Sequence, residues 1–343
     1  VSSIRDDLAR RDFTVGAMAW HPERGLCDPF GGQTDLKNGV LRAVGNADTR
    51  FQEDALRILR GLRFASKLGF AIEPETAAAM RRQVHRLDCI AAERIREELT
   101  GLLCGRYVQR TLMAYADLIT SALPELAPML GCQQQNPHHL YDVWEHTVRA
   151  VGQVPAEPVL RWAMLLHDSG KPACKTVDEQ GIGHFRGHPR ASLALSRELL
   201  PRLRFSSADT ERILLLVERH DTPLGDNEKL VRRSLSRIGE ARFRDLLAIK
   251  KGDAVGQGTS RDYVAQLFET EVLLNRVLAQ EQCFSLRQLA VNGADLQALG
   301  LRGRPVGEML HALLDAVIDG RTDNRRETLL RLARTRMEEQ HDK

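Results

Sequence analysis

The sequence predicts a mainly α-helical chain with a small β-containing portion at its front. Apolar residues recur at helical spacing through most of the chain from Phe51 onward, whereas residues 13–45 contain the strong strand signals. A chain of 343 residues is long enough for two or three domains that each have a core. Loops and turn residues divide it into four predicted segments: residues 1–45, 46–130, 131–255 and 256–343.

The front segment is predicted to contain short strands. Phe13 to Trp20 is an apolar run, the HPERG stretch turns the chain toward Leu26, and Val40 and Leu41 follow an Asn-Gly turn. We interpret this segment as the edge of a sheet whose other strands lie upstream of the chain.

The second segment is predicted to be a series of amphipathic helices. In the first helix, which starts near Phe51, leucines at helical spacing form one stripe and arginines occupy another face. Further helices are expected over Glu75–Arg86, Ala91–Leu103 and Val108–Ser121. A loop rich in Gln, Asn and His (GCQQQNPHH) leads into the third segment, and the fourth segment includes the basic stretch RTDNRRETLLRLARTR.

Composition limits the class of protein without naming a function. The net charge of +3 is a slight basic excess, which permits nucleic-acid binding without requiring it. The six cysteines have no C-x-x-C spacing, so we expect reduced thiols in a cytoplasmic protein. No apolar run is long enough for a membrane span.

The first motif with chemical content is RFQEDALRILRGLRFASKLGF, in which an acidic pair opens the predicted helix. Asp54 and Arg57 are three residues apart, so on a helix their side chains lie on one face. A carboxylate that accepts and a guanidinium that donates can match the edge of a nucleobase, and further arginines can bind phosphate oxygens. The same spacing fits an ion pair on a solvated helix, and spacing alone does not decide between the two.

Histidines and aspartates are concentrated in the third segment. His167 and Asp168 are adjacent near the end of an apolar helix and could both reach a divalent ion. His146 and Asp253, from other helices, would complete a site inside a helix bundle. A single histidine on an apolar face is more often a core residue than a ligand. Five histidines with paired aspartates are harder to explain by packing, because each buried imidazole needs its own partner.

The blocks RDDLARRDFTVGAMAW, DPFGGQTDLKNGVLRAVG and the Asp54 motif resemble the class II tRNA nucleotidyltransferases, the family of CCA-adding enzymes and bacterial poly(A) polymerases. The resemblance implies that seven residues bind the incoming nucleotide: Arg10, Arg11, Asp12, Asp54, Arg57, Arg60 and Arg63. The first three would handle the ribose and phosphates. Asp54 and Arg57 would be a protein template that pairs with the base of CTP or ATP, and the last two arginines would lie beside them.

Two motifs that carry the chemistry of this family do not occur in the sequence. They are an upstream Gly-Gly loop that ends in Val-Arg-Asp and an Asp-x-Asp strand that holds two metal ions, expected to be Mg²⁺. The chain opens with Val1, and Asp6 and Asp7 are adjacent rather than alternating. We therefore expect that the N-terminal part of the catalytic head is missing. Catalytic residues for nucleotide transfer are unknown, and transfer by this chain alone is doubtful.

The order of histidines and aspartates resembles the HD phosphohydrolase superfamily, a helical group of metal-dependent enzymes that act on phosphate esters and nucleotides. The ligands implied for a first metal are His146, His167, Asp168 and Asp253. Those implied for a second metal are His188 and His220. The ion would be Mn, Ni, Fe or Zn. Lys171 could contact a substrate phosphate, His184 and Asp221 are weaker candidates, and Gly252 stands where relatives often have Ala.

Together the resemblances imply a head remnant (1–45), a helical neck for base recognition and RNA binding (46–130), an HD domain (131–255) and a tRNA-binding tail (256–343). The expected function is the addition of CCA to tRNA with CTP and ATP, in the cytoplasm and away from membranes. Alternatives are a phosphohydrolase with the HD site as its only working centre, a CC-adding or A-adding specialist, a poly(A) polymerase, and a tRNA-binding remnant. The sequence does not decide the HD metal, its natural substrate, the oligomeric state, or whether the chain is a fragment or a natural short form.

Overall fold

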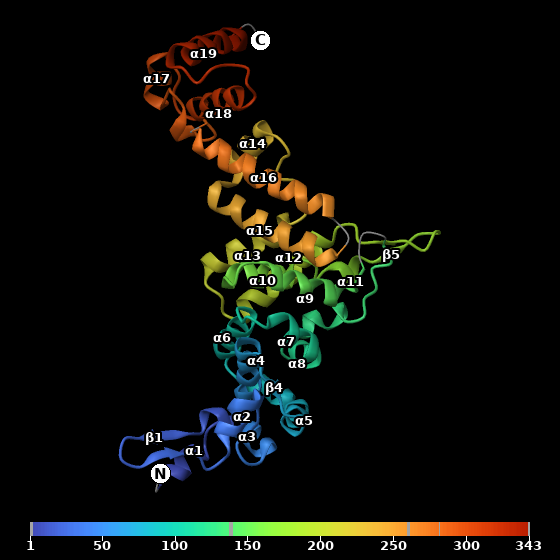
Figure 1. Cartoon of the computed structure of the whole chain (residues 1–343). Helices are drawn as coiled ribbons and strands as arrows, with labels where there is room; N and C mark the ends of the chain where they lie inside the picture. Colours follow the sequence, from blue (N-terminus) through green and yellow to red (C-terminus); the bar gives the residue numbers. More distant parts are fainter. Residues whose placement is uncertain (1–2, 137–139, 259–260, 281, 342–343) are drawn as a thin grey trace. The chain divides into compact units, whose positions relative to one another are not determined.

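The computed structural model describes residues 3–136, 140–258, 261–280 and 282–341, and it is mainly α-helical, as predicted (Figure 1). The chain forms two compact units, Val1–Asp221 with Ala248–Arg261 and Thr222–Leu247 with Asp262–Lys343. The four segments expected from the sequence stay a prediction. Residues 137–139 of the GCQQQNPHH loop lie outside the described residues. Within the described parts of the chain, no helix is long and apolar enough to cross a membrane.

Short strands occur in the front segment, but one of them is not where the sequence predicted it. β1 (Ala19–His21) and β2 (Gly25–Cys27) form the antiparallel hairpin expected around HPERG. β3 (Val40–Leu41) is also confirmed, and it pairs in parallel with β4 (Ala71–Ile72), a strand that was not predicted. The strand expected from Phe13 to Trp20 is wrong over its first half, where Thr14–Gly16 is a 3-10 turn.

The turn at Thr14 has a clear cause in the side-chain contacts. The Thr14 hydroxyl donates a 2.7 Å hydrogen bond to the buried carboxylate of Asp35, on α2 (Gly32–Asn38). The Ala17 N–H donates to the Thr14 carbonyl oxygen, so the backbone closes a local turn in place of a strand ladder. Phe13 keeps a single β-bridge, to Ala43, and is fully buried. An apolar run alone cannot distinguish such a buried turn from a strand.

The helix predicted from Phe51 is two helices, and this correction bears on the site. α3 (Ala47–Glu53) ends at Asp54, which has an extended backbone, and α4 (Leu56–Leu68) begins two residues later. The Asp54 carboxylate accepts a 3.0 Å hydrogen bond from the Leu56 N–H, which satisfies one of the free donors at the start of α4. The break therefore follows from the tendency of aspartate to bond nearby backbone.

The remaining helices of the second segment agree in place with the prediction, with one break. They are α5 (Pro74–Gln83), α6 (Ala92–Leu103), α7 (Val108–Ala114) and α8 (Ala116–Ala122), followed by the 3-10 turn Pro124–Met129. The single helix expected over Val108–Ser121 is interrupted at Tyr115. α4 packs along α6, and Leu59, Leu62, Leu102 and Leu103 are buried between the helices and their neighbours.

A helix bundle with a small hairpin follows. Its elements are α9 (Val143–Gln153), α10 (Pro158–Leu166), α11 (Lys171–Cys174), β5 (Thr176–Val177), β6 (Gly183–His184), α12 (His188–Arg202), α13 (Ser207–Arg219) and α15 (Glu240–Gln257). α10 packs against α9 and α13, and α12 packs against α13 (Figure 1). Trp162, at the centre of α10, is fully buried, so the end of this helix is held in a rigid core.

The second unit has its own apolar core. Its further elements are α14 (Glu228–Ile238), α16 (Arg261–Ala279), a 3-10 turn (Leu286–Gln288), α17 (Gly293–Ala298), α18 (Arg304–Ile318) and α19 (Arg326–His341). Leu296, Leu313 and Leu329 come from three of these helices and are fully buried together. This packing fixes which faces of α18 and α19 are exposed to solvent.

Candidate functional site

A pocket of about 520 Å³ lies where the front segment meets α4 and α6. Of the seven residues predicted to bind nucleotide, six line this pocket: Arg10, Arg11, Asp12, Asp54, Arg57 and Arg60. The structure thus brings together side chains from two separate sequence motifs. Because the pocket carries several guanidinium groups and two carboxylates, it suits a ligand with phosphates and with hydrogen-bonding groups of its own.

Arg57 is held rigidly at the pocket wall. Its Nη2 donates to the carbonyl oxygen of Arg10 at 2.8 Å, and its Nη1 donates to the carbonyl oxygen of Arg50 at 3.1 Å. The same Nη1 also lies 2.9 Å from a carboxylate oxygen of Glu53. Because its contacts come from three points on the chain, the guanidinium has one orientation before any ligand enters.

Asp54 does not stand on the same helix as Arg57, contrary to the prediction. It precedes α4, and one carboxylate oxygen is used by the Leu56 N–H. The other oxygen, Oδ2, accepts a 3.1 Å hydrogen bond from Nη2 of Arg94. Asp54 and Arg57 nevertheless both line the pocket, so an acceptor and a donor face the same space even though the helical-spacing argument for them fails.

Arg60 and Arg63 have different surroundings although they follow one another at helical spacing. Arg60 lines the pocket, and its Nε lies 2.7 Å from a carboxylate oxygen of Asp12. Arg63 is not among the lining residues, and its Nε lies 2.9 Å from the buried carboxylate of Glu98 on α6. Burial raises the pKa of Glu98, and Arg63 and Arg60 oppose that rise. The nucleotide-binding role expected for Arg63 stays a prediction.

Arg94 and Phe64 line the pocket but were not identified from the sequence. Phe64 lies on α4, where the guanidinium of Arg60 stacks over its ring at 5.5 Å. Its position one residue after Arg63, on a helix with a recognised motif, is a signal that could have suggested it. Arg94 carries no such signal, because only the packing of α6 along α4 brings it to Asp54.

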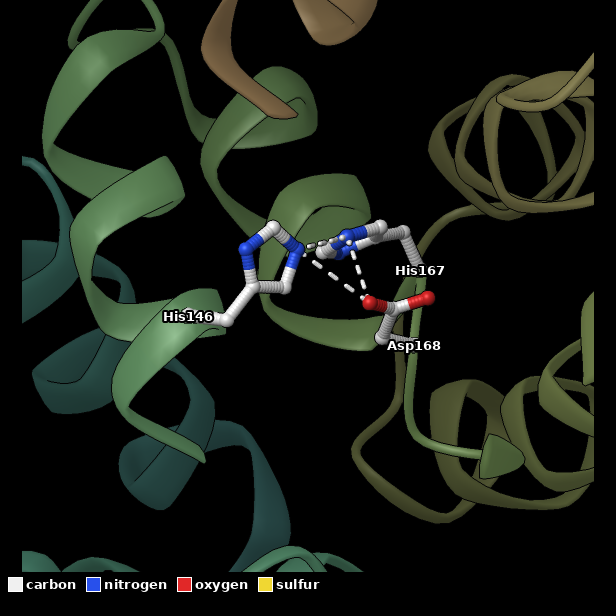
Figure 2. Close-up of side chains that lie close together, drawn as sticks. All are labelled: His146, His167 and Asp168. Carbon is white, nitrogen blue, oxygen red and sulfur yellow. Dashed lines mark hydrogen bonds and ion pairs between the residues drawn. The ribbon is translucent and has the colours of Figure 1, made fainter. Parts of the chain in front are cut away.

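The second cluster lies inside the helix bundle, where His146, His167 and Asp168 point toward one another (Figure 2). The Nε2 atoms of the two histidines are 3.3 Å apart, and each lies 3.2 Å from Oδ2 of Asp168. Asp253 on α15 places Oδ1 3.0 Å from Nε2 of His146 and 3.7 Å from Nε2 of His167. The four residues implied for a first metal are therefore brought together.

His188 and His220 form a second group on the other side of Asp168. Their Nε2 atoms are 3.2 Å apart and lie 3.3 and 3.8 Å from Oδ1 of Asp168. Asp221, a weaker candidate from sequence, places carboxylate oxygens 3.4 Å from both rings. The two oxygens of Asp168 thus face two different histidine pairs, an arrangement that could bridge two ions.

The orientation of the rings fits metal ligation. In His167, His188 and His220, the ring Nδ1 lies 2.7 to 2.9 Å from the backbone carbonyl oxygen three residues earlier. A carbonyl oxygen only accepts, so Nδ1 carries a proton in each ring, and Nε2, which presents a lone pair whenever the ring is neutral, faces the cluster. This is the outer hydrogen bond that orients metal-binding histidines.

The electrostatics of the cluster follow from its burial. Burial opposes ionisation of Asp168, but the charges of His167 and Lys171 hold the pKa of Asp168 well below its usual range. Burial lowers the pKa of His220 to about 4, with a further contribution from His167. A buried anion surrounded by imidazole rings is an arrangement that a divalent cation can neutralise.

Lys171 is more buried than we expected for a residue that contacts a substrate phosphate. Its side chain is buried, its Nζ lies 2.7 Å from Oδ2 of Asp168, and it donates a 2.9 Å hydrogen bond to Oε1 of Gln134. It also lines a pocket of about 380 Å³ beside the cluster, as does His184. Nε2 of His184 lies 2.7 Å from Oδ2 of Asp178, which is not one of the aspartates of the cluster. The role of Lys171 toward phosphate stays a prediction.

Helix packing explains why position 252 is a glycine. A Cβ at this position would lie 2.6 Å from Cγ1 of Val154 and 3.0 Å from Cε of Met164. An alanine at this position therefore requires the side chains of Val154 and Met164 to shift. The glycine lets α15 approach both helices closely enough for Asp253 to reach the cluster.

Comparison with known proteins decides the family. Residues 1–42 match the poly A polymerase head domain, and residues 69–130 match the probable RNA and SrmB-binding site of polymerase A. The chain is 38% identical to the A-adding tRNA nucleotidyltransferase of Deinococcus radiodurans over 331 residues, which cover 92% of this chain and 75% of the relative. The chain belongs to the tRNA nucleotidyltransferase family.

Other tRNA nucleotidyltransferases support the same conclusion. The CC-adding enzyme of Thermus thermophilus is 33% identical over 94% of this chain and 76% of its own length. The crystal structure of the Bacillus stearothermophilus CCA-adding enzyme in complex with CTP matches with a TM-score of 0.72 and 26% identity, over 100% of this chain and 76% of that one. The Thermotoga maritima CCA-adding enzyme complexed with tRNA shares the fold, with a TM-score of 0.57 at 20% identity and coverage of 98% and 74%.

The family and the mainly α fold expected from the sequence are therefore confirmed. The chain is of the tRNA nucleotidyltransferase enzyme class, as predicted. The roles of the individual site residues stay predictions.

Proposed function

We propose that this tRNA nucleotidyltransferase adds CCA to the 3′ end of tRNA and that the pocket at α4 selects CTP and ATP. The observation that carries the proposal is that six predicted nucleotide-binding residues line one pocket, with Asp54 and Arg57 both at its wall. Relatives of this chain include an A-adding and a CC-adding enzyme, so a one-nucleotide specialist is the alternative.

The chemistry of the pocket matches these two bases. Cytosine and adenine each present an amino group beside a ring nitrogen that accepts, whereas uracil and guanine present a carbonyl oxygen beside a ring N–H. A carboxylate such as Asp54 accepts from the amino group, and a guanidinium such as Arg57 donates to the ring nitrogen. With uracil or guanine, acceptor would face acceptor and donor would face donor, which excludes them.

Arg10, Arg11 and Arg60 are the remaining cationic side chains of the predicted set at the pocket. We assign them to the triphosphate and ribose, since arginine binds phosphate oxygens with two parallel hydrogen bonds. Enzymes of this family use a divalent cation for nucleotide transfer. We assign no residue of this chain to that cation, because the sequence holds no Asp-x-Asp pattern.

Equilibrium dialysis of the four nucleoside triphosphates against the chain tests the template. We expect CTP and ATP to bind more tightly than UTP and GTP, and we expect Arg57→Ala to remove most of that preference. Arg81→Ala is the matched control, because Arg81 forms a similar 2.6 Å pair with Asp117 outside the pocket. If either Arg57→Ala or Asp54→Asn leaves the CTP-to-UTP preference intact, the template assignment is wrong.

A second candidate function rests on the histidine cluster, which we propose holds one or two divalent transition-metal ions. The donor set fits such ions, because Nε2 lone pairs and the oxygens of Asp168 and Asp253 converge. A bound ion would activate water and polarise a phosphoryl oxygen. His146, His167 and the two aspartates would hold the first ion, and His188 and His220 the second. Lys171 would be the contact for a substrate phosphate.

The metal proposal is tested by metal content and by hydrolysis. The chain, loaded with manganese or nickel, is assayed on an aryl phosphate and on a cyclic nucleotide phosphate. Activity that disappears in His167→Ala, together with loss of bound metal, supports the proposal. Absence of both metal and turnover with each ion would leave the cluster a structural network.

A further inference from the structure

We propose that Arg94 is a positioning residue that sets base selectivity by holding the carboxylate of Asp54. The inference rests on the proposed nucleotide pocket and adds a residue that lies outside the two motifs of the sequence. Arg94 stands in the first turn of α6, and its side chain lines the pocket. It would act through Asp54 rather than through the nucleotide itself.

The contacts of Asp54 come from two helices. Oδ1 accepts from the Leu56 N–H at the start of α4, and Oδ2 accepts from Nη2 of Arg94 on α6. A carboxylate held at one oxygen can still turn about its side-chain bonds. Because the second contact comes from a different helix, it fixes the plane of the carboxylate relative to the pocket.

Arg94 is the pocket arginine whose guanidinium contacts this carboxylate. Arg57 is bound to Glu53 and to backbone oxygens, Arg60 to Asp12, and Arg11 to Asp7. Within the described residues, the ion-pair partner of Asp54 is therefore Arg94 and not Arg57. The protein uses a separate cation to orient the acceptor half of the template, which leaves Arg57 as the donor half.

The contact with Arg94 leaves room for a base. Each oxygen of a carboxylate has two lone pairs, so Oδ2 can accept from Arg94 and from the amino group of cytosine or adenine together. Without Arg94, the carboxylate could rotate away from the amino group, and its repulsion of the carbonyl oxygen of uracil would fall as well. The variant should thus bind CTP more weakly and UTP at least as tightly as the unaltered chain does.

A thermodynamic cycle measures this coupling. Binding of CTP and UTP by equilibrium dialysis is compared for the unaltered chain, Arg94→Ala, Asp54→Asn and the double variant. We expect Arg94→Ala to lower the CTP-to-UTP affinity ratio about tenfold, the size of one charge-assisted hydrogen bond. In the Asp54→Asn background, Arg94→Ala should have little further effect, because the group on which it acts has been altered.

Two further variants separate positioning from general stability. Arg94→Lys keeps a cation near Asp54 and should restore part of the ratio. Arg81→Ala removes an exposed arginine from a comparable ion pair with Asp117 and should leave the ratio unchanged. Should Arg94→Ala fail to fold, Arg94→Gln, which keeps most of the side-chain length, takes its place in the same cycle.

The outcomes distinguish this inference from the function on which it rests. An unchanged ratio in Asp54→Asn overturns the template itself. If Asp54→Asn lowers the ratio but Arg94→Ala does not, or if Arg94→Ala lowers it equally in both backgrounds, Arg94 does not position Asp54 and this inference is wrong while the template stands.

Discussion

His146 on α9 and Asp253 on α15 are far apart in the sequence, yet Nε2 of the first lies 3.0 Å from Oδ1 of the second. The contact depends on how closely α15 approaches α9 and α10. At Gly252 that approach leaves no space for a β-carbon. Helix packing therefore favours glycine at position 252, next to the proposed metal ligand Asp253.

Gly252→Ala should destabilise the protein and weaken metal binding. Its added methyl group would press on Val154 and Met164, and overpacking of this kind costs about 1–3 kcal/mol. Urea unfolding and metal analysis of the purified variant measure the two effects. Gly307→Ala is the matched control, because Gly307 lies on α18 with open space where a β-carbon would stand, and this variant should gain about 0.5–1 kcal/mol. Equal stability of the two variants would contradict the packing argument.

Asp168→Asn should reduce metal binding at both groups, whereas His188→Ala should reduce it only at the second. The reason is that Oδ2 of Asp168 faces His146 and His167, while Oδ1 faces His188 and His220. Isothermal titration calorimetry with Mn²⁺ gives the number of ions that each variant binds. Retention of one full-affinity site in Asp168→Asn would show that the carboxylate does not bridge two ions.

How far the sequence predicted these sites depends on where each residue lies in the chain. Arg57 and Arg60 belong to a local motif and line the pocket as expected. The orientation of Asp54 was not predictable from spacing. Its side chain accepts a hydrogen bond from the Leu56 N–H, and Asp54 lies in the break between α3 and α4. Arg94 could not be found at all, since its proximity to Asp54 exists only after α6 packs along α4.

The histidine cluster was predictable for a different reason. Its members lie on several helices, but each is a residue type that seldom lacks a partner when buried, so their number alone pointed to one shared site. The strand that failed, from Phe13, illustrates the opposite case. Its apolar pattern was real, and the deciding contact was a hydrogen bond from Thr14 to Asp35 that no local pattern contains.

Arg63→Ala should lower the free energy of unfolding more than it lowers nucleotide affinity. Arg63 faces the carboxylate of Glu98 rather than the pocket, and its loss leaves this buried carboxylate to the more distant Arg60, 3.9 Å away, which costs about 1–3 kcal/mol. Urea unfolding and CTP binding measure the two quantities. A large loss of CTP affinity with unchanged stability would instead support the nucleotide-binding role expected from the sequence.

The stability loss in Arg63→Ala should also depend on pH. Burial raises the pKa of Glu98, and loss of Arg63 removes one of the charges that oppose the rise. The folded variant then binds more protons than the unfolded chain, so its stability falls as pH rises from the usual glutamate pKa through the raised one. The difference in the free energy of unfolding between the variant and the unaltered chain should therefore shrink in acid. Urea unfolding curves measured at about one-unit intervals from roughly pH 4 to 8 check this direction.

Binding of tRNA should become less salt-dependent when exposed arginines of α19 are removed. Arg331 and Arg334 are exposed on this helix, in the basic stretch that fits either a tRNA contact or a solvated face. If each arginine contacts one phosphate, Arg331→Ala with Arg334→Ala should reduce the slope of log K against log salt by about 1–2, because fewer counterions are released. Filter binding of tRNA from low to moderate salt gives the slope. Arg244→Ala serves as the control, since Arg244 is already paired with Glu240 at 2.9 Å. An unchanged slope in the double variant would mean that this face of α19 is only solvated, and the tail would then need another surface to hold tRNA.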